Sequence, residues 1–276
     1  MNDKYIYSIG LMSGTSLDGL DIVYVKFHKN DYSEFEIIHS NTIKYSEFWE
    51  ARLKNSIHLD TELLSVLDYD YGQYLGNKTQ EFISKNKITS LDFIASHGHT
   101  VLHQPDDGIT FQVGDGQQIY NITKSTTVSD FRTQDVQLGG QGAPLVPIGD
   151  RILFSEYDAC VNLGGFANIS YEYRDNRIAF DICPVNIVMN YYCKKIGLHY
   201  DDKGIIASKG SVHEGLLEDL NCLDYYSKKP PKSLGLEWVI RYVYPLLDDY
   251  KLDVEDVLRT FIEHISQQIS IIIHPF

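Results

Sequence analysis

The sequence predicts an α/β fold built from two similar lobes with a cleft between them. Three observations support this prediction. Strand-like and helix-like stretches alternate, a unit of strand, glycine turn and two further strands occurs twice, and its two copies lie about a domain's length apart. The 276 residues, of which 43% are hydrophobic, are enough to build sizeable cores. We expect the lobes to cover residues 1–154 and 155–276.

The first half of the chain alternates between the two patterns. A turn rich in Gly, Ser and Thr follows the first strand, and apolar residues then recur at helical spacing between Asp60 and Lys85, which predicts a long amphipathic helix. A shorter helix is expected near Gln117–Thr123. Strands are expected at residues 5–11, 22–27, 34–40, 92–96 and 127–131. Because strands and helices alternate, the sheet should be partly parallel.

The second half repeats the opening pattern. Gly164 and Gly165 form the turn, and strands are expected at residues 158–163, 168–173 and 177–182. The region 201–232, rich in Gly, Ser, Lys and Pro, is expected to be loop with short elements. An amphipathic helix is expected over Asp253–Ile273, ended by Pro275.

The composition excludes several classes of function. A net charge of −14 argues against a surface for nucleic acid or anionic membranes, which requires clustered Lys and Arg. The longest apolar stretches, such as Ile269–Ile273, are far too short to cross a bilayer, and the N-terminus shows no secretion signal. The four cysteines form no CxxC pair, as is typical of reduced thiols. These features predict a cytoplasmic protein.

The first hairpin turn, within Gly10–Asp21, is a candidate nucleotide site. Its amides could bind phosphate oxygens and its two Asp residues could hold Mg²⁺, although the same residue types also build an ordinary hairpin. The chain has no GxxxxGK[ST], which excludes a P-loop site, and the absence of a strand–GxGxxG–helix unit argues against a Rossmann site. The candidate nucleotide-binding residues of this turn are Gly14, Thr15, Ser16, Leu17, Asp18, Gly19, Leu20 and Asp21.

Longer strings along the chain are more specific than any single residue type. Besides Gly10–Asp21 they are Ser96–Gly98 with Thr100 and His103, Gln112–Asp115, Ser129–Arg132, Gly139–Pro147, Asn162–Asn168 and Pro230–Ser233. In this order they resemble the anhydro-N-acetylmuramic acid kinase family over essentially the whole chain. Gly139–Pro147 is particularly specific, because no local structural rule demands that combination of residues.

The resemblance implies the two-lobed actin/hexokinase-like fold with a duplicated ribonuclease H-like unit, which agrees with the repeated hairpin. It also implies a kinase that opens the 1,6-anhydro ring of anhydro-N-acetylmuramic acid with water and phosphorylates the freed O6, with ATP and Mg²⁺, in cell-wall recycling. By resemblance, Asp135 is the general base that takes a proton from the attacking water, a role suited to a carboxylate. The implied substrate-binding residues are His97, Asp115, Arg132 and Gln141.

A second phosphate-binding loop is expected after the repeated hairpin. It combines Gly164 and Gly165 with Asp181 and Asn186, and Asp181 joins Asp18 as a candidate metal ligand. The family commonly has Thr-Gly-Pro-Gly-Asn after this Asp, whereas the present chain has Ile-Cys-Pro-Val-Asn and lacks the two glycines that allow close backbone approach. Cys183, in this loop, is expected to be a packed thiol because no paired His is identifiable.

Two side-chain arrangements stay open at the level of the sequence. Arg132 could pair with Asp130, with Asp135 or with an anionic ligand group. His97, His99 and His103 have a spacing compatible with zinc. Because no carboxylate accompanies them and the family often has Gln in place of His99, hydrogen bonding in a substrate cleft is favoured.

The resemblance further implies that family members continue past this length, with a final strand and a glycine-rich adenosine loop. We therefore expect a C-terminally truncated chain with an incomplete second lobe, weak nucleotide binding and low activity, in which a homodimer could cover exposed apolar surface. A noncatalytic nucleotide- or sugar-binding relative of the same fold is the main alternative. A kinase for a different amino sugar is another.

Overall fold

The computed structural model describes residues 4–14, 17, 19–104, 107–230 and 232–274. Its internal contacts divide the chain into two compact units, Met1–Val146 and Pro147–Phe276. The lobe boundary expected after residue 154 lies at the end of helix α5 (Val146–Leu153), whereas the contacts divide the chain where that helix begins. Among the described residues, no helix is both long enough and apolar enough to span a bilayer.

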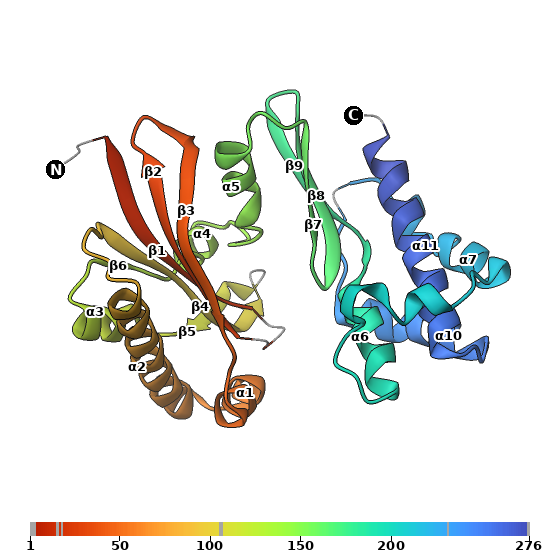
Figure 1. Ribbon diagram of the computed structural model, residues 1–276, viewed down its shortest axis with the longest axis horizontal. Helices are drawn as coiled ribbons and strands as arrows, with labels where there is room; N and C mark the ends of the chain where they lie inside the picture. The colour runs from red at the N-terminus through yellow and green to blue at the C-terminus, as the bar shows by residue number, and fades with distance from the viewer. Residues whose placement is uncertain (1–3, 15–16, 18, 105–106, 231, 275–276) are drawn as a thin grey trace. The chain divides into compact units, whose positions relative to one another are not determined.

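The first unit contains a mixed sheet, which confirms the α/β class and the expected partly parallel pairing (Figure 1). Among the described residues it has six strands in the order β3-β2-β1-β4-β5, with β6 beside β4. Strands β1, β2 and β3 form an antiparallel meander, while β1 pairs with β4 and β4 with β6 in parallel. The bounds are β1 Tyr5–Ser13, β2 Leu20–His28, β3 Asp31–Ile43, β4 Phe93–Gln104, β5 Ile109–Val113 and β6 Thr127–Val128.

Helix α2 (Thr61–Lys85) covers one face of this sheet, as its apolar periodicity predicts. Asp60 caps it by accepting the N–H of Leu63 at 2.9 Å. Helix α3 (Gly116–Thr123) lies beside α2 (Figure 1). The other helices of the unit are α1 (Glu47–Lys54), the 3₁₀ turn η1 (Ser56–His58) and α4 (Thr133–Gln137).

The contact between α2 and α3 is made through glycine. A Cβ atom at Gly72 would lie 2.6 Å from the carbonyl oxygen of Asp115, and one at Gly76 would lie 2.8 Å from the Ile122 side chain. Both distances are too short for ordinary packing, so the two helices approach each other only because these side chains are missing. This packing fixes α3 against α2, and only Gly114 and Asp115 separate the N-terminus of α3 from the end of β5.

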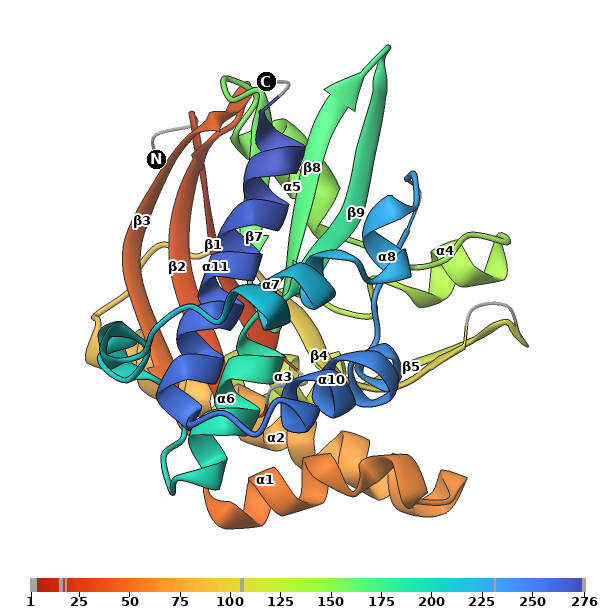
Figure 2. The same cartoon turned by 90° about the vertical axis from the view of Figure 1, so that its right-hand side faces the viewer.

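The second unit repeats the antiparallel meander with β7, β8 and β9. Helices α6, α7 and α11 gather on one side of it, where residues such as Ile169, Ile182 and Phe261 form the core (Figures 1 and 2). The strands are β7 Ala159–Leu163, β8 Phe166–Tyr173 and β9 Asn176–Pro184. The helices are α6 Asn186–Lys195, η3 Asp202–Gly204, η4 Ala207–Lys209, α7 Glu214–Asn221, α8 Asp224–Ser227, α9 Leu236–Trp238, the π-helical turn η5 Val239–Val243, α10 Tyr244–Asp249 and α11 Val254–Ile273.

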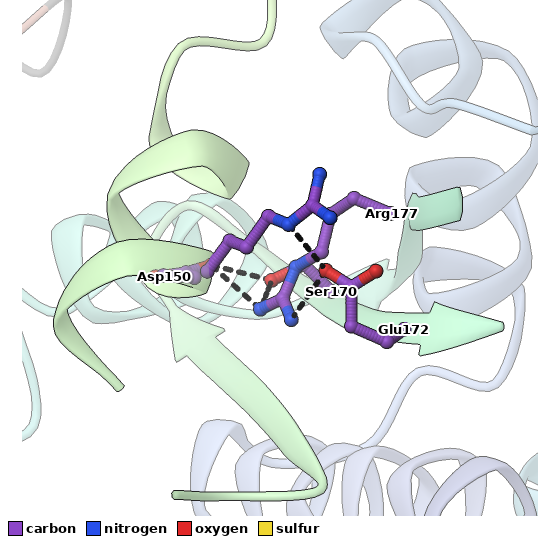
Figure 3. A network of polar contacts seen from close by, with 5 residues as sticks. Asp150, Ser170, Glu172 and Arg177 are labelled. Carbon is purple, nitrogen blue, oxygen red and sulfur yellow. Dashed lines mark hydrogen bonds and ion pairs between the residues drawn. The ribbon is translucent and has the colours of Figure 1, made fainter. Parts of the chain in front are cut away.

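The opposite face of the β7–β8–β9 sheet carries a polar network with helix α5 (Figure 3). Ser170 donates to Asp150 and accepts from Arg177 at 2.8 Å, and Arg177 also contacts Glu172 at 3.6 Å. The Arg177 side chain is only 11% exposed. Because a charge with so little access to water requires partners, this network holds α5 on the sheet.

Several expected elements differ from the structure. The strand expected at 127–131 ends at Val128, and the one expected at 92–96 extends to Gln104, where it gains β5 as a partner. The region 201–232, expected as loop with short elements, includes the eight-residue helix α7. Helix α7 is stabilised because Leu216 and Leu220 are buried in the same core as α11, a tertiary contact that the composition of the region does not reveal.

The close packing of α2 on α3 yields a stability prediction. Replacing Gly72 by Ala should lower the free energy of unfolding by about 1–3 kcal/mol, because the new methyl group overlaps the Asp115 backbone. Gly149→Ala is the control, because a Cβ there meets nothing within 4 Å and alanine favours a helix by about 0.5–1 kcal/mol. Urea unfolding of both variants checks this, and equal midpoints would contradict it.

The buried His264 makes the stability of the second unit dependent on pH. Its Nδ1 donates to Asn221 at 2.7 Å and its Nε2 accepts from Tyr226 at 2.8 Å, as in a neutral ring, and burial lowers the pKa of His264 to about 3. The unfolded chain binds a proton near pH 6.5 and the folded chain does not, so this contribution is complete above pH 6.5 and is lost as the pH falls towards 3.

The corresponding measurement is urea unfolding between pH 7.5 and pH 4. The wild type should lose up to about 1.4 kcal/mol per pH unit below pH 6.5 through His264. His264→Gln, which does not titrate, should show a shallower slope. If the free energy of unfolding depended on pH equally in the two proteins, the pKa of His264 would not be lowered by folding.

Candidate active site

The loop between α4 and α5 fixes the carboxylate of Asp135. Its Oδ2 accepts the N–H of Gly142 at 2.7 Å, and its carbonyl accepts the N–H of Gly140 at 2.8 Å. A Cβ atom on Gly140 would overlap this carboxylate, and Gly142 adopts a φ of 61°, so both positions require glycine. The side chain is nevertheless exposed, so it is held in place and open to solvent.

Arg132 connects this loop to strand β4. Its Nη2 and Nε lie 2.9 and 3.2 Å from Nε2 of His97, and its Nη1 donates to the carbonyl of Gly142 at 3.1 Å. In the described part of the chain it forms no ion pair with Asp130 or Asp135, two of the three alternatives left open by the sequence. The half-buried guanidinium therefore keeps its charge available for an anionic ligand group.

His97 is held as a neutral acceptor. Its Nδ1 donates to the carbonyl of Gly98 at 3.0 Å, which leaves Nε2 to accept from Arg132. Burial lowers the pKa of His97, and the charge of Arg132 lowers it further.

The other two histidines of this string have separate partners. His99 bonds Ser13 at 3.0 Å, Tyr45 donates to the same hydroxyl at 2.7 Å, and burial lowers the pKa of His99 to about 4. His103 bonds Thr110 at 3.2 Å. Among the described residues, no group of three or more His, Cys, Asp or Glu side chains converges as a metal site. The histidines thus act through hydrogen bonds.

Two cavities of the first unit meet at His97, which lines both. The larger, of about 880 Å³, lies against β1, β2 and β3 and includes Asp21, Arg132 and the segment Ala143–Val146. The smaller, of about 200 Å³, is lined mostly by polar residues, Asp115 among them. Gln141, the fourth candidate for substrate binding, is exposed beside Gly142. The structure therefore brings His97, Arg132 and Asp115 to neighbouring cavities.

The first hairpin turn is described in part. Leu17 has a φ of 59° and donates to the carbonyl of Gly14 at 3.3 Å, while Gly19 packs so closely on β3 that a Cβ would lie 2.7 Å from the carbonyl oxygen of Ile43. Leu20 is fully buried in the core, so only its backbone could meet a ligand. Asp21 is exposed and accepts from the hydroxyl of Thr42. Thr15, Ser16 and Asp18 lie outside the described residues.

Asp181 is held from three sides by a segment distant in sequence. Its N–H donates to the carbonyl of Lys232 at 3.3 Å, its carbonyl accepts from Tyr225 at 2.6 Å, and its carboxylate accepts the N–H of Leu234 at 2.8 Å. Burial raises the pKa of Asp181. The family-like string that contains Lys232 therefore belongs to this site. The sequence alone does not indicate where this string lies.

Lys232 adds a cation to this part of the second unit. Its ammonium donates to the carbonyl of Tyr225 at 3.3 Å and lies 4.5 Å from the centre of that ring, and burial lowers the pKa of Lys232.

The turn at Gly164 and Gly165 closes onto the start of α6. The Gly165 carbonyl accepts the N–H groups of Val185 at 2.8 Å and Ile187 at 3.2 Å, and the Gly164 carbonyl accepts that of Asn186 at 3.3 Å. These amides are therefore occupied within the protein, whereas the side chain of Asn186, a candidate nucleotide-binding residue, is exposed. Cys183 is fully buried and burial raises its pKa to about 12, which confirms the packed thiol.

Comparison with known proteins shows what the chain is similar to. The model of the family "Anhydro-N-acetylmuramic acid kinase" matches residues 6–275. A relative of that name from Zymomonas mobilis subsp. mobilis is 37% identical over 246 residues, covering 82% of this chain and 67% of the relative. Those from Clostridioides difficile and Bacillus thuringiensis are 34% and 33% identical, each covering 92% of this chain and 72% of the relative.

The contact between Arg132 and His97 can be tested by nuclear magnetic resonance. In the wild type, the ¹⁵N shifts of His97 should report the Nδ1–H tautomer and a pKa below the ordinary 6.5. Arg132→Leu should raise the pKa of His97, because it removes a neighbouring positive charge and lets water reach the ring. The control, Arg241→Leu in the second unit, should leave the pKa of His97 unchanged. An unchanged pKa of His97 in Arg132→Leu would contradict the contact.

Proposed function

The chain belongs to the anhydro-N-acetylmuramic acid kinase family, and we propose that it opens the 1,6-anhydro ring of anhydro-N-acetylmuramic acid with water and phosphorylates the freed O6 with ATP. The observation that carries this proposal is the family match over residues 6–275, which includes every candidate site residue. The product would be N-acetylmuramic acid 6-phosphate. A cytoplasmic location and a homodimer stay predictions.

In the proposed reaction Asp135 acts as the general base. The oxygen of water bonds the anomeric carbon, the bond from that carbon to O6 breaks, and O6 takes the γ-phosphoryl group as ADP leaves. The water proton passes to Asp135. The N–H of Gly142 orients one carboxylate oxygen, and no described residue forms a hydrogen bond with the other, which supports this role.

We assign the sugar's carboxylate to Arg132. The guanidinium lines the larger cavity, is half-buried, and is held by two neutral acceptors, His97 and the Gly142 carbonyl. A cation that is positioned but not neutralised binds a carboxylate more strongly than one already in an ion pair.

The nucleotide would be bound by the two candidate phosphate loops. Mg²⁺, which neutralises phosphate charge when bound, is usually held by one or two protein carboxylates together with water and phosphate oxygens. Asp181 fits this donor set, because the Leu234 amide bonds one of its carboxylate oxygens and the other could bind the ion. Burial raises the pKa of Asp181, and a bound cation would favour its charged form. Asp18 is the second proposed ligand.

One observation favours a second candidate function. The amides of Val185, Asn186 and Ile187 are bonded to the carbonyls of Gly164 and Gly165, so this loop offers a phosphate fewer free donors than open turn amides would. A chain that binds nucleotide or sugar without turnover would be consistent with that closure. Binding and turnover therefore have to be measured on the same protein.

The decisive variant is Asp135→Asn. It should lower the rate of ADP and phosphorylated-sugar formation by roughly 10²- to 10⁴-fold, because Asn cannot take the proton of water. Asn can still accept the N–H of Gly142, so sugar affinity and unfolding should change little. The control is Asp175→Asn, in the turn between β8 and β9, where a φ of 64° suits Asn and full activity is expected.

The outcomes of this assay separate the two functions. Turnover by the wild type and not by Asp135→Asn supports the kinase with Asp135 as its base. Sugar and nucleotide binding without turnover by the wild type supports the noncatalytic relative. Equal turnover by the wild type and Asp135→Asn would remove Asp135 from the mechanism.

A further inference from the structure

A chain of buried hydrogen bonds reaches Ser13, the last residue of β1 before the first hairpin turn. Tyr45 donates to the Ser13 hydroxyl at 2.7 Å, and this hydroxyl lies 3.0 Å from Nδ1 of His99. The hydroxyl groups of Tyr45 and Tyr71 are 2.6 Å apart. The four side chains belong to β1, to β4, to α2 and to the connection between β3 and α1, so the chain of bonds joins four parts of the first unit.

The hydroxyl protons give this chain a direction. A hydroxyl donates only one hydrogen bond, so Tyr45, which donates to Ser13, accepts from Tyr71. The Ser13 hydroxyl can then donate its own proton to Nδ1 of His99, which accepts only in the neutral ring. Burial lowers the pKa of His99 to about 4, which keeps the ring neutral near pH 7. His99 is therefore the acceptor at the end of the chain.

A bulge in β4 directs His99 towards Ser13. The pairing of β1 with β4 shifts register just before the pair formed by these two residues. Gly98 has a φ of 69°, and a Cβ there would lie 2.6 Å from a carbonyl oxygen of β5, so the bulge requires glycine. In a regular strand His97 and His99 would point to the same face. Here His97 bonds Arg132, whereas His99 bonds Ser13 and is absent from the described linings of both cavities.

This network fixes one end of the first hairpin turn. Ser13 forms the last pair of the β1–β2 ladder with Leu20, and it is only 2% exposed. The other end is fixed by the packing of Gly19 on the backbone of Ile43. A buried polar network whose members are paired makes the groups that it joins rigid. A turn whose two ends are held before a ligand arrives loses less conformational entropy when it binds.

We propose that His99 is a positioning residue for the nucleotide, which acts by accepting from Ser13 and so holds the base of the first hairpin turn in the conformation that binds the phosphates of ATP. His99 is 4% exposed and acts through Ser13, without touching the ligand. This inference rests on the proposed function and deepens it, because it names a residue behind the turn that determines nucleotide affinity.

The test is calorimetric titration of the full chain with the Mg²⁺ complex of a nonhydrolysable ATP analogue and, separately, with anhydro-N-acetylmuramic acid. His99→Leu should weaken nucleotide binding by roughly 2- to 15-fold, the equivalent of one hydrogen bond, because the Ser13 hydroxyl loses its acceptor. Sugar affinity should stay the same. The matched control is His39→Leu, which removes a histidine that stacks on Tyr24 in the same sheet and should change neither affinity.

His99→Asn separates positioning from a structural role. Oδ1 of Asn lies as far along the side chain as Nδ1 of His, so it can accept from Ser13, whereas Leu cannot. Both variants disturb a buried position and should lower the midpoint of urea unfolding. Only His99→Leu should weaken nucleotide binding, and His99→Asn should bind nucleotide nearly as well as the wild type. A structural role would lower both midpoints and leave the nucleotide affinity of the folded proteins equal.

The other outcomes are distinguishable. Nucleotide affinity that is the same in the wild type and His99→Leu overturns this inference and leaves the proposed function intact. Equal weakening by His99→Leu and His99→Asn would remove the hydrogen bond as the cause and overturn it too. So would a parallel loss of sugar and nucleotide affinity in His99→Leu, which would indicate general damage to the first unit. A wild type that binds no nucleotide contradicts the proposed function, and this inference with it.

Discussion

The candidate site in the first unit depends on the hydrogen bond from the Gly142 amide to the Asp135 carboxylate. This bond turns the chain back on itself after α4, and the missing side chain of Gly140 provides the space in which the carboxylate lies. The Gly142 carbonyl then accepts from Arg132, which reaches His97 on β4. The loop after α4 is thus tied to β4, and the position of the proposed base follows from the position of the sheet.

The two cavities of the first unit differ in the charged side chains that line them. Arg132 brings a positive charge to the larger cavity, and three carboxylates line the smaller one. These charges do not cancel within the protein, because Arg132 is paired with neutral acceptors in the described part of the chain. The positive charge of Arg132 and the carboxylates of the smaller cavity are thus not neutralised by each other. Such an arrangement is typical of sites in which a bound ligand supplies the opposite charge.

The second unit shows a different kind of support. Asp181 lies at the outer edge of β9, and the segment that contains Tyr225, Lys232 and Leu234 occupies its backbone and side-chain groups. The edge is therefore covered, and the carboxylate has a defined orientation. The neighbouring Gly164–Gly165 turn satisfies the amides of α6 by itself, which is consistent with the absence of glycine between Asp181 and Asn186 in this chain.

The amino-acid sequence by itself determined the elements whose pattern is local: the two antiparallel meanders, α2 and α11, and the family strings. It did not reveal β5, α5 or α7, which are short. Strand β5 and helix α7 depend on burial against other elements, and α5, which has no buried residue, depends on the polar contacts of Asp150. Only the tertiary structure decided that Arg132 bonds His97 across 35 residues and that Leu234 bonds Asp181 across 53. The physical reason is that hydrogen bonds, desolvation and cavities depend on which groups folding brings together. The sequence states the chemical type of each group but not which groups surround it.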